Sequence, residues 1–264
     1  MAPNRRRRPG SEGDFAEEGL AGEPAEAELD DCPFCAGRED RTPPETLRVG
    51  GPPGWLVRVV PNLYPAFERQ EVAVHSPRHV RTFADLTDEE VAAVAAAWRG
   101  RRREAAAAGF PYVHALVNEG RAAGSSLPHS HSQLVWLREP PPAVAAERPD
   151  ALPRLLAEDD LRIAELDGIV AVAHRAGGLP YETLIGGEPF DLATALVLLR
   201  TVVRRLRAAE GPVPWNAWLH GGAQPHLELV PRLAIQAGVE LGAGIAVNTV
   251  APEDAAAALR DVDS

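Results

Sequence analysis

Three polar side chains that can donate or accept hydrogen bonds recur at every second position near the middle of the chain: His129, His131 and Gln133. In an extended segment, residues two apart point to the same face and lie roughly 6.5 to 7 Å apart. A stretch rich in glycine and serine, residues 124–126, comes just before them. The pattern predicts a site that handles an anion. The competing interpretation is a solvated edge strand in which the histidines have no special role.

His131 is the candidate nucleophile of this segment. A neutral imidazole attacks through one nitrogen when a backbone acceptor holds the other as N–H, and attack on an α-phosphorus would give a nucleotidyl-histidine. Backbone N–H groups of Gly124 and Ser125, and the hydroxyl of Ser126, could hold the phosphate oxygens. Gln133 can donate an amide N–H to the same oxygens without transferring a proton, which favours transfer to a second acceptor over hydrolysis.

A second candidate site begins at Cys32 and Cys35, which form a Cys-x-x-Cys turn. No apolar segment follows the N-terminal arginines, so we expect a reducing, cytoplasmic location, where such a pair is more often a metal or redox site than a disulfide. His79 and His129, each at an expected strand end, complete a Cys2His2 set. Zinc takes such donors in a tetrahedron, and four protein ligands leave no open position. We predict one structural Zn2+ per chain; the alternative is that both histidines are ordinary surface residues.

The overall composition is that of a soluble globular protein, with 45% hydrophobic and 25% charged residues among 264. The formal net charge is −11, and all 27 basic residues are arginine. An acidic surface argues against non-specific binding to nucleic acid. No stretch approaches the roughly 18 consecutive apolar residues of a membrane-spanning helix. Neither nucleic acid nor a membrane is therefore an expected partner.

The elements that must position these residues form two halves with the same order of strands and helices. In the first we expect strands at 55–60, 71–75 and 112–117, a helix from 88 to about 108 behind a Thr87–Glu90 capping box, and the histidine-bearing segment. In the second we expect strands at 168–173, 215–220 and 226–230, a turn plus a strand within 177–185, and helices at 192–209 and 253–262. The fold class is therefore predicted as α+β, with two tandem units of antiparallel sheet and flanking helices. His129-Ser-His131 is aligned with His226-Leu-Glu228.

Composition divides the chain into four predicted regions. These are a flexible arginine-bearing segment (1–30), a catalytic N-terminal unit (31–138), a proline-rich linker (139–155) and a C-terminal unit (156–264). In the first region, Arg5 and Arg8 could fold over a phosphate. A solvated tail is the alternative.

At these residues the chain resembles the galactose-1-phosphate uridylyltransferase family, a branch of the histidine-triad superfamily. The family motif Asn-Pro-His-x-His-x-Gln reads Leu127-Pro-His129-Ser-His131-Ser-Gln133 here. The arginine segment, the Cys-x-x-Cys turn, Ser76-Pro-Arg-His79 and the loop 118–126 also match. The resemblance implies two histidine-triad-like domains, a structural zinc, and a homodimer with sites at the subunit interface.

For function, the resemblance implies a two-step transfer in which His131 takes UMP from UDP-glucose and passes it to a hexose 1-phosphate, such as galactose 1-phosphate. It places Asn62 and Asn118 near the substrate and Glu240 near the sugar hydroxyls. Adenylyl transfer of the ADP-glucose phosphorylase type is an alternative. So are nucleotide hydrolysis on the same fold and a non-catalytic, zinc-stabilised nucleotide-binding module.

Three positions depart from the family pattern. Leu63 stands where an Asp often lies near the nucleoside, which leaves the base open. Ala246 replaces a Gln near the sugar, which leaves the hexose open. The second metal of some members needs a His-x-His pair, and here that pair reads His226-Leu-Glu228. The sequence therefore leaves a second metal site open.

Overall fold

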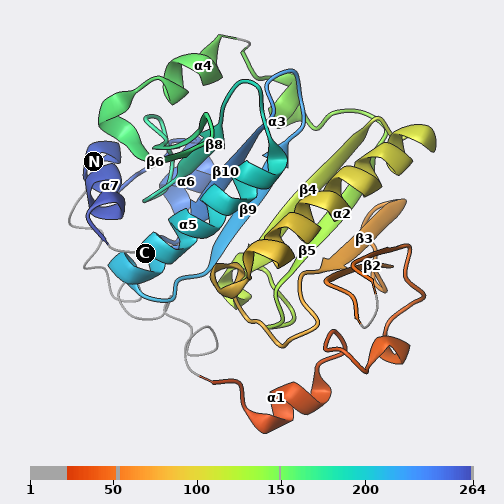
Figure 1. Cartoon of the computed structure of the whole chain (residues 1–264). Coiled ribbons are helices and arrows are strands. Elements are labelled where there is room, and N and C mark those ends of the chain that lie inside the picture. The colour runs from red at the N-terminus through yellow and green to blue at the C-terminus, as the bar shows by residue number, and fades with distance from the viewer. Residues whose placement is uncertain (1–22, 52–53, 149, 263–264) are drawn as a thin grey trace.

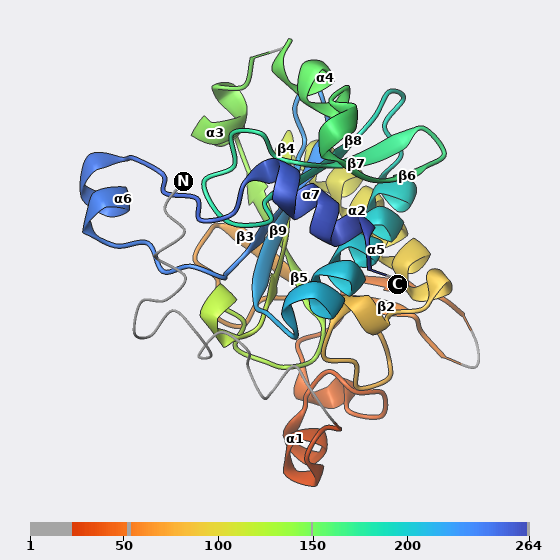
Figure 2. The same cartoon turned by 90° about the vertical axis from the view of Figure 1, so that its left-hand side faces the viewer.

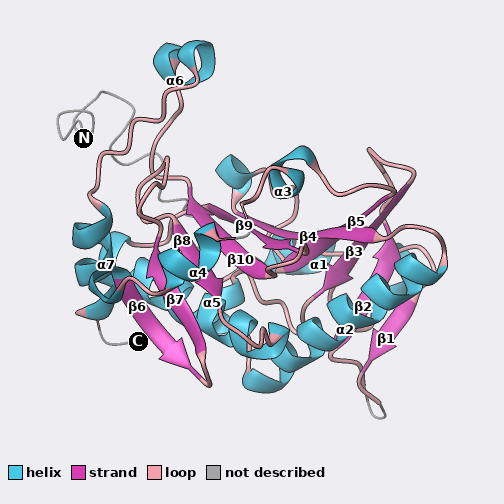
Figure 3. Cartoon of the chain, turned by 90° about the horizontal axis from the view of Figure 1, so that it is seen from above, coloured by secondary structure: helices cyan, strands magenta, loops and turns pink. Residues whose placement is uncertain are grey.

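A single ten-stranded antiparallel sheet forms the centre of the computed structural model, which describes residues 23–51, 54–148 and 150–262 (Figure 3). The strand order is β1-β2-β3-β5-β4-β9-β10-β8-β7-β6. The strands are β1 (Leu47–Val49), β2 (Val57–Pro61), β3 (Arg69–Val74), β4 (Tyr112–Glu119), β5 (His131–Leu137), β6 (Arg162–Leu166), β7 (Ile169–Ala173), β8 (Thr183–Gly186), β9 (Trp215–His220) and β10 (His226–Pro231).

The two halves of the sheet repeat one another. Each half supplies three strands, a long helix and two more strands, and the strand order of one half mirrors that of the other about the β4–β9 junction. The predicted α+β fold of two tandem units is confirmed. One correction is needed, because the two units share a continuous sheet: β4 pairs with β9 from Leu116–Trp218 to Glu119–Trp215.

The first residues of β5 and β10 also correct the predicted alignment of the two halves. β5 and β10 each begin at a histidine, so His131 corresponds to His226 and Gln133 to Glu228. The alignment of His129 with His226 is wrong by two residues. His129 lies before β5, where the alternation of a strand no longer fixes the direction of its side chain.

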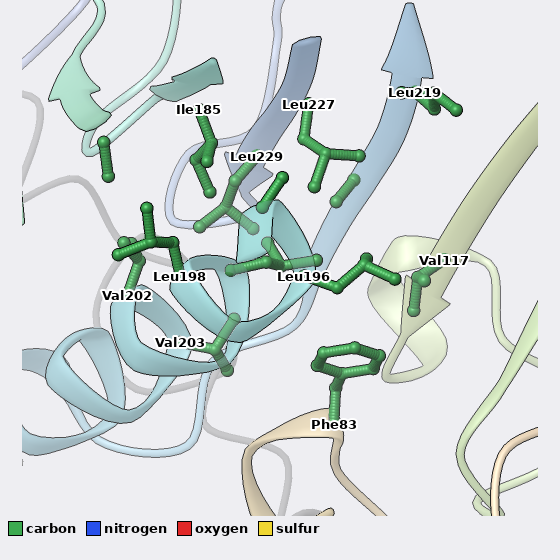
Figure 4. Close-up of a cluster of buried hydrophobic side chains, with 14 of the residues drawn as sticks. Phe83, Val117, Ile185, Leu196, Leu198, Val202, Val203, Leu219, Leu227 and Leu229 are labelled. Atoms are coloured by element: carbon green, nitrogen blue, oxygen red, sulfur yellow. The ribbon is translucent and has the colours of Figure 1, made fainter. Parts of the chain in front are cut away.

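Two long helices, α2 (Asp88–Ala107) and α5 (Leu192–Glu210), lie side by side over one face of the sheet (Figure 1). The predicted capping box opens α2, since the Glu90 amide donates to Thr87 Oγ1 at 3.2 Å and the Thr87 amide to Glu90 Oε2 at 2.8 Å. Apolar side chains of α5, Leu196 among them, pack toward Leu227 and Leu229 of β10 (Figure 4). Burying each such side chain contributes about 1.5 to 3 kcal/mol.

Because the helices cover one face of the sheet, a substrate can reach only side chains on the other face. Trp98 of α2 donates its indole N–H to Ser132 Oγ at 2.9 Å, so Ser132 faces the helices. Side chains alternate along a strand. His131 and Gln133 therefore face the side of the sheet that α2 does not cover.

Several short helices lie where the sequence analysis predicts no helix. They are α1 (Glu26–Asp31), α3 (Pro142–Ala145), α4 (Ala151–Leu156) and α6 (Gly238–Ala243); the last helix, α7, spans Pro252–Arg260. The end of the predicted flexible segment and the predicted linker therefore contain helices. β1 and β6 are also missed, since three to five half-exposed residues show too little periodicity to stand out. Within the described ranges, none of the helices combines the length and apolar character needed to span a membrane.

Candidate functional site

A cavity of about 470 Å3 opens between the end of β4 and the start of β5. The loop that joins these strands forms much of its wall. The lining residues are Glu28, Arg81, residues 117–121 and residues 125–131. Of the predicted site residues, the structure brings His131, Ser126, Ser125, Asn118 and His129 together here.

His131 is held in a single orientation at this cavity. Its Nδ1–H donates to the backbone carbonyl of His129 at 2.7 Å, which leaves Nε2 as the nitrogen with a free lone pair. The side chain is only 7% exposed. Burial lowers its pKa, and the hydrogen bond to the carbonyl opposes that shift without reversing it. The imidazole is therefore neutral near pH 7, the state that a nucleophile needs.

The loop before His131 is shaped by left-handed glycines. Gly120 and Gly124 have φ of 85° and 89°, a region in which side chains are strained. The turn closes where the Ser125 amide donates to the Gly120 carbonyl at 3.0 Å and the Gly124 amide donates to the Arg121 carbonyl at 2.9 Å. The two amides predicted to hold a phosphate are therefore already bonded within the turn. Asn216 of β9 donates to Asn118 Oδ1 and to the Ala123 carbonyl, each at 2.8 Å. A strand of the second half thus fixes the loop of the first.

Cys32, Cys35, His79 and His129 converge beside the cavity, and their ligand atoms all lie within 4.8 Å of one another. His129 Nδ1 lies 3.4 Å from Cys32 Sγ, and His79 Nδ1 lies 3.3 Å from Cys35 Sγ. Burial lowers the pKa of His129 to about 3, so its ring is neutral. Burial and the neighbouring Cys32 raise the pKa of Cys35 to about 12. Cys35 therefore becomes a thiolate near neutral pH only if a cation lies beside it.

The outer nitrogens of both histidines are also held. His129 Nε2–H donates to the Ser76 carbonyl at 2.9 Å, and His79 Nε2–H donates to Glu28 Oε1 at 2.7 Å. Glu28 in addition pairs with Arg81, which lines the cavity. Such outer partners fix the tautomer in which Nδ1 offers its lone pair to a metal. The donor set therefore fits zinc.

Phe34, between the two cysteines, joins the cysteine turn to the nucleophile. Its ring meets the His131 ring edge-on at 5.5 Å between centroids, and the His129 ring at 5.9 Å. An ordered cysteine turn therefore helps to hold His131 in two ways: by the packing of Phe34 against its ring, and by the short backbone link from His129 to His131.

Several predicted site residues do not line the cavity. Gln133 lies two residues along β5 from His131, on the same face, and its Oε1 accepts from Gln70 at 2.6 Å. Asn62 caps its own turn, accepting the Tyr64 amide at 2.8 Å. Glu240 accepts the amide of Ala237, the residue before α6, and α6 projects from the body (Figure 2). Arg5 and Arg8 lie outside the described residues.

Sequence reasoning missed several charged groups at the cavity: Glu28, Arg81, Arg121 and Glu119. Glu119 accepts from Thr82 Oγ1 at 2.5 Å, from the Phe83 amide at 2.7 Å and from Trp215 Nε1 at 2.9 Å. Burial outweighs these donors and raises its pKa to about 7. The only signal in the sequence was position, since Glu119 directly precedes Gly120.

A third group of polar side chains lies in the second half. Ligand atoms of Glu147, His220 and His226 lie within 4.8 Å of one another. His226 repeats the arrangement of His131, since its Nδ1–H donates to the carbonyl two residues back, that of Gln224, at 2.9 Å. Both ring nitrogens of His220 face carboxylates, those of Glu147 at 2.5 Å and Glu228 at 2.8 Å. Sequence spacing did not reveal Glu147 or His220, because they come from separate elements.

A doubled α+β unit with a carbonyl-held histidine at a glycine-rich loop defines a protein with the histidine-triad type of fold. Residues 65–141 match the family model described as galactose-1-phosphate uridyl transferase, N-terminal domain. This part of the chain is therefore similar to the galactose-1-phosphate uridylyltransferase family.

Similar proteins cover most of the chain. ADP-glucose phosphorylase of Arabidopsis thaliana is 27% identical over 294 aligned residues, covering 88% of this chain and 82% of the relative. The crystal structure of an Arabidopsis thaliana ADP-glucose phosphorylase with bound ADP-glucose superposes with a TM-score of 0.78 at 26% identity, covering 92% of this chain and 93% of that one. A GalT-like protein from the same plant gives 0.79 at 26% identity, covering 88% and 92%.

Proposed function

We propose that the protein transfers a nucleotidyl group from a sugar nucleotide through a covalent intermediate on His131. The observation that carries this proposal is the 2.7 Å bond from His131 Nδ1–H to the His129 carbonyl, which leaves Nε2 as the attacking nitrogen at the cavity. Burial keeps that nitrogen unprotonated near pH 7.

The reaction has two displacements. In the first, the Nε2 lone pair forms a bond to the α-phosphorus. The bond from phosphorus to the bridging oxygen breaks, and the sugar 1-phosphate leaves with the electron pair. In the second, an oxygen of an acceptor phosphate attacks the same phosphorus, and the P–N bond returns its electrons to His131. The hydroxyl of Ser126 and the amide of Gln133 stabilise the charge on the phosphoryl oxygens, since the Gly124 and Ser125 amides donate within their own turn.

Phosphorolysis of an ADP-sugar is the specific reaction that we favour, with inorganic phosphate as acceptor. The 27% identity to ADP-glucose phosphorylase over 88% of this chain supports it. The second candidate is transfer of UMP from UDP-glucose to galactose 1-phosphate, supported by the family model matched at residues 65–141. Leu63, where the family often has an acid near the nucleoside, is consistent with a base other than uracil; it is 64% exposed.

The proposal includes one structural zinc held by Cys32, Cys35, His79 and His129. When bound, the metal would supply order and no chemistry of its own, because four protein ligands fill a tetrahedron. The chain's own contribution is to hold the His129 carbonyl where it orients His131, since His129 is at once a donor in the metal set and the acceptor of the His131 bond.

The proposal also includes a homodimer. The arm around α6 exposes Ile235, Val239, Leu241 and Ile245, the third of these by 74%, and projects from the body (Figures 2 and 3). An apolar surface of this kind is typical of a protein–protein contact. Glu240 lies on the same arm and, within its own chain, does not line the cavity. A second copy that receives the arm would explain both features.

The test is intact-protein mass after brief incubation with ADP-glucose, UDP-glucose and their analogues. We expect an AMP adduct with ADP-glucose that is removed by inorganic phosphate with release of ADP. The variant His131→Ala should form no adduct yet retain the cavity and the metal set. An active His131→Ala enzyme would refute the proposal, as would a wild-type protein that turns over sugar nucleotides without an adduct.

A further inference from the structure

A short chain of hydrogen bonds runs from the loop after β2 to the predicted phosphate donor. The Ala66 amide donates to Gln70 Oε1 at 2.8 Å, and Gln70 Nε2 donates to Gln133 Oε1 at 2.6 Å. Gln70 lies on β3 and Gln133 on β5. Both are half-buried, and neither family motif nor sequence spacing singled out Gln70.

The direction of this chain follows from its first member. A backbone N–H can only donate, so the atom of Gln70 that faces Ala66 must be its oxygen. The amide nitrogen of Gln70 then faces Gln133, and the atom of Gln133 that receives it must again be an oxygen. The amide nitrogen of Gln133 is left with two donors, and it meets no acceptor among the residues that the structure describes.

The two glutamines share a face with His131. Val74 pairs with His131, and Val72 with Gln133, while Gln70 is opposite Val135. Gln70 and Gln133 are therefore diagonal neighbours on the face that also carries His131. Two donors on that face, one strand step of roughly 7 Å beyond the nucleophile, can reach the oxygens of a phosphate that His131 attacks.

The second half of the sheet shows what the same two positions do with other side chains. Gln133 corresponds to Glu228. Gln70 lies two residues before Val72, the strand partner of Gln133, and Glu182 lies two residues before Leu184, the strand partner of Glu228. Gln70 therefore corresponds to Glu182. Glu182 and Glu228 lie close enough, with His174, to hold a cation. Carboxylates only accept hydrogen bonds, so they repel a phosphate where amides can donate to one. The two positions thus carry amides in the first half and carboxylates in the second.

We propose that Gln70 is a positioning residue: it holds the amide of Gln133 with both N–H bonds directed toward the phosphoryl oxygens of the substrate. The inference rests on the proposed nucleotidyl transfer and adds a residue to it. Gln70 touches no substrate itself. Its N–H donor keeps the Gln133 oxygen turned toward Gln70. The opposite orientation of the Gln133 amide would present that oxygen to the phosphate.

Gln70→Glu tests the proposal directly. The new carboxylate can still accept the Ala66 amide, but its second oxygen also needs a donor, and the nearest is the amide nitrogen of Gln133. Gln133 must then turn round and lose its donors to the substrate. We expect single-turnover formation of the AMP adduct at saturating ADP-glucose to slow about 100-fold, the usual effect of losing one such donor. Gln70→Ala removes the constraint without reversing the amide, so we expect a smaller loss of about 10-fold.

A double-mutant cycle distinguishes the positioning role of Gln70 from a merely structural one. In a Gln133→Ala background, Gln70→Glu should add less than about twofold, because the residue through which it acts is gone. Ala107→Glu adds the same charge at an exposed position of α2, which covers the opposite face, and should leave the rate unchanged. Equal slowing by Gln70→Glu in both backgrounds would overturn the role of Gln70, as would a wild-type rate in Gln70→Glu. A wild-type protein that forms no adduct would overturn the proposed function itself.

Discussion

At the scale of single residues, two histidines two positions apart are distinguished by which ring nitrogen is held. His129 donates from Nε2 and offers Nδ1 to the cysteines, whereas His131 donates from Nδ1 and keeps Nε2 for the cavity. The residue types and spacing led to a prediction of the same kind, with His129 in the metal set and His131 as the nucleophile. The acceptors that enforce this division, the carbonyls of Ser76 and His129, are backbone groups that no sequence pattern marks.

Glu119 supplies a prediction at the same scale. Burial raises its pKa from an ordinary 4.5 to about 7. Between these values the folded protein holds a proton that the unfolded chain releases, so this group makes the free energy of unfolding fall as pH rises from about 4.5 to 7. Glu119→Gln removes that dependence. Between pH 5 and pH 8, we expect denaturant melts of the wild type to lose on the order of 2 to 3 kcal/mol more than those of the variant.

Wild type and Glu119→Gln share all their other titrating groups. Only the difference between their slopes of unfolding free energy against pH is therefore assigned to Glu119. Glu139→Gln, at an exposed carboxyl in the segment after β5, is a matched control and should leave the wild-type curve unchanged. Parallel curves for wild type and Glu119→Gln would show that the carboxyl is ionised throughout the range.

At the scale of elements, the long and strongly patterned pieces were predictable. The α2 and α5 helices, β9 and β10 lie within one or two residues of their predicted bounds, since capping residues and apolar periodicity mark them. The short α1 was not predictable. Glu26 and Glu28 favour its first turn electrostatically, but Glu28 is ordered by His79 and Arg81, which lie some fifty residues away in sequence.

That contact predicts a role for α1 in metal binding. Glu28→Gln weakens the acceptor for His79 Nε2–H and loses the ion pair with Arg81. We expect zinc affinity to fall about 10- to 100-fold, the usual effect of changing an outer partner of a metal ligand. Competition with a chromophoric chelator measures it. Glu26→Gln alters an exposed carboxylate of the same helix and should match wild type. Equal affinities for the two variants would remove α1 from the site.

At the scale of the whole molecule, the duplication was readable from the sequence, but the joined sheet was not. The β4–β9 pairing depends on register between strands about a hundred residues apart, and local periodicity carries no information on it. The junction has a consequence for the site. Asn216 of β9 reaches across it to hold Asn118 and the Ala123 carbonyl, so the loop at the cavity takes its shape from both halves. Separate halves would lose this contact.

The arm around α6 carries the last prediction, which concerns two copies of the chain. If Glu240 serves the cavity of a second copy, then His131→Ala and Glu240→Ala are each inactive alone, but their heterodimer contains one site with both residues intact. After dissociation and reassociation of an equal mixture, half of the dimers are mixed and each has one complete site of two. We expect about one quarter of wild-type activity to return. Leu241→Glu should prevent recovery and give a monomer by light scattering, since it charges a side chain that is 74% exposed in the single chain. The same change at Leu166, an exposed leucine of β6, is the control and should leave both the dimer and the recovery intact. No recovery from the mixture, with the dimer preserved, would show that each chain completes its own site.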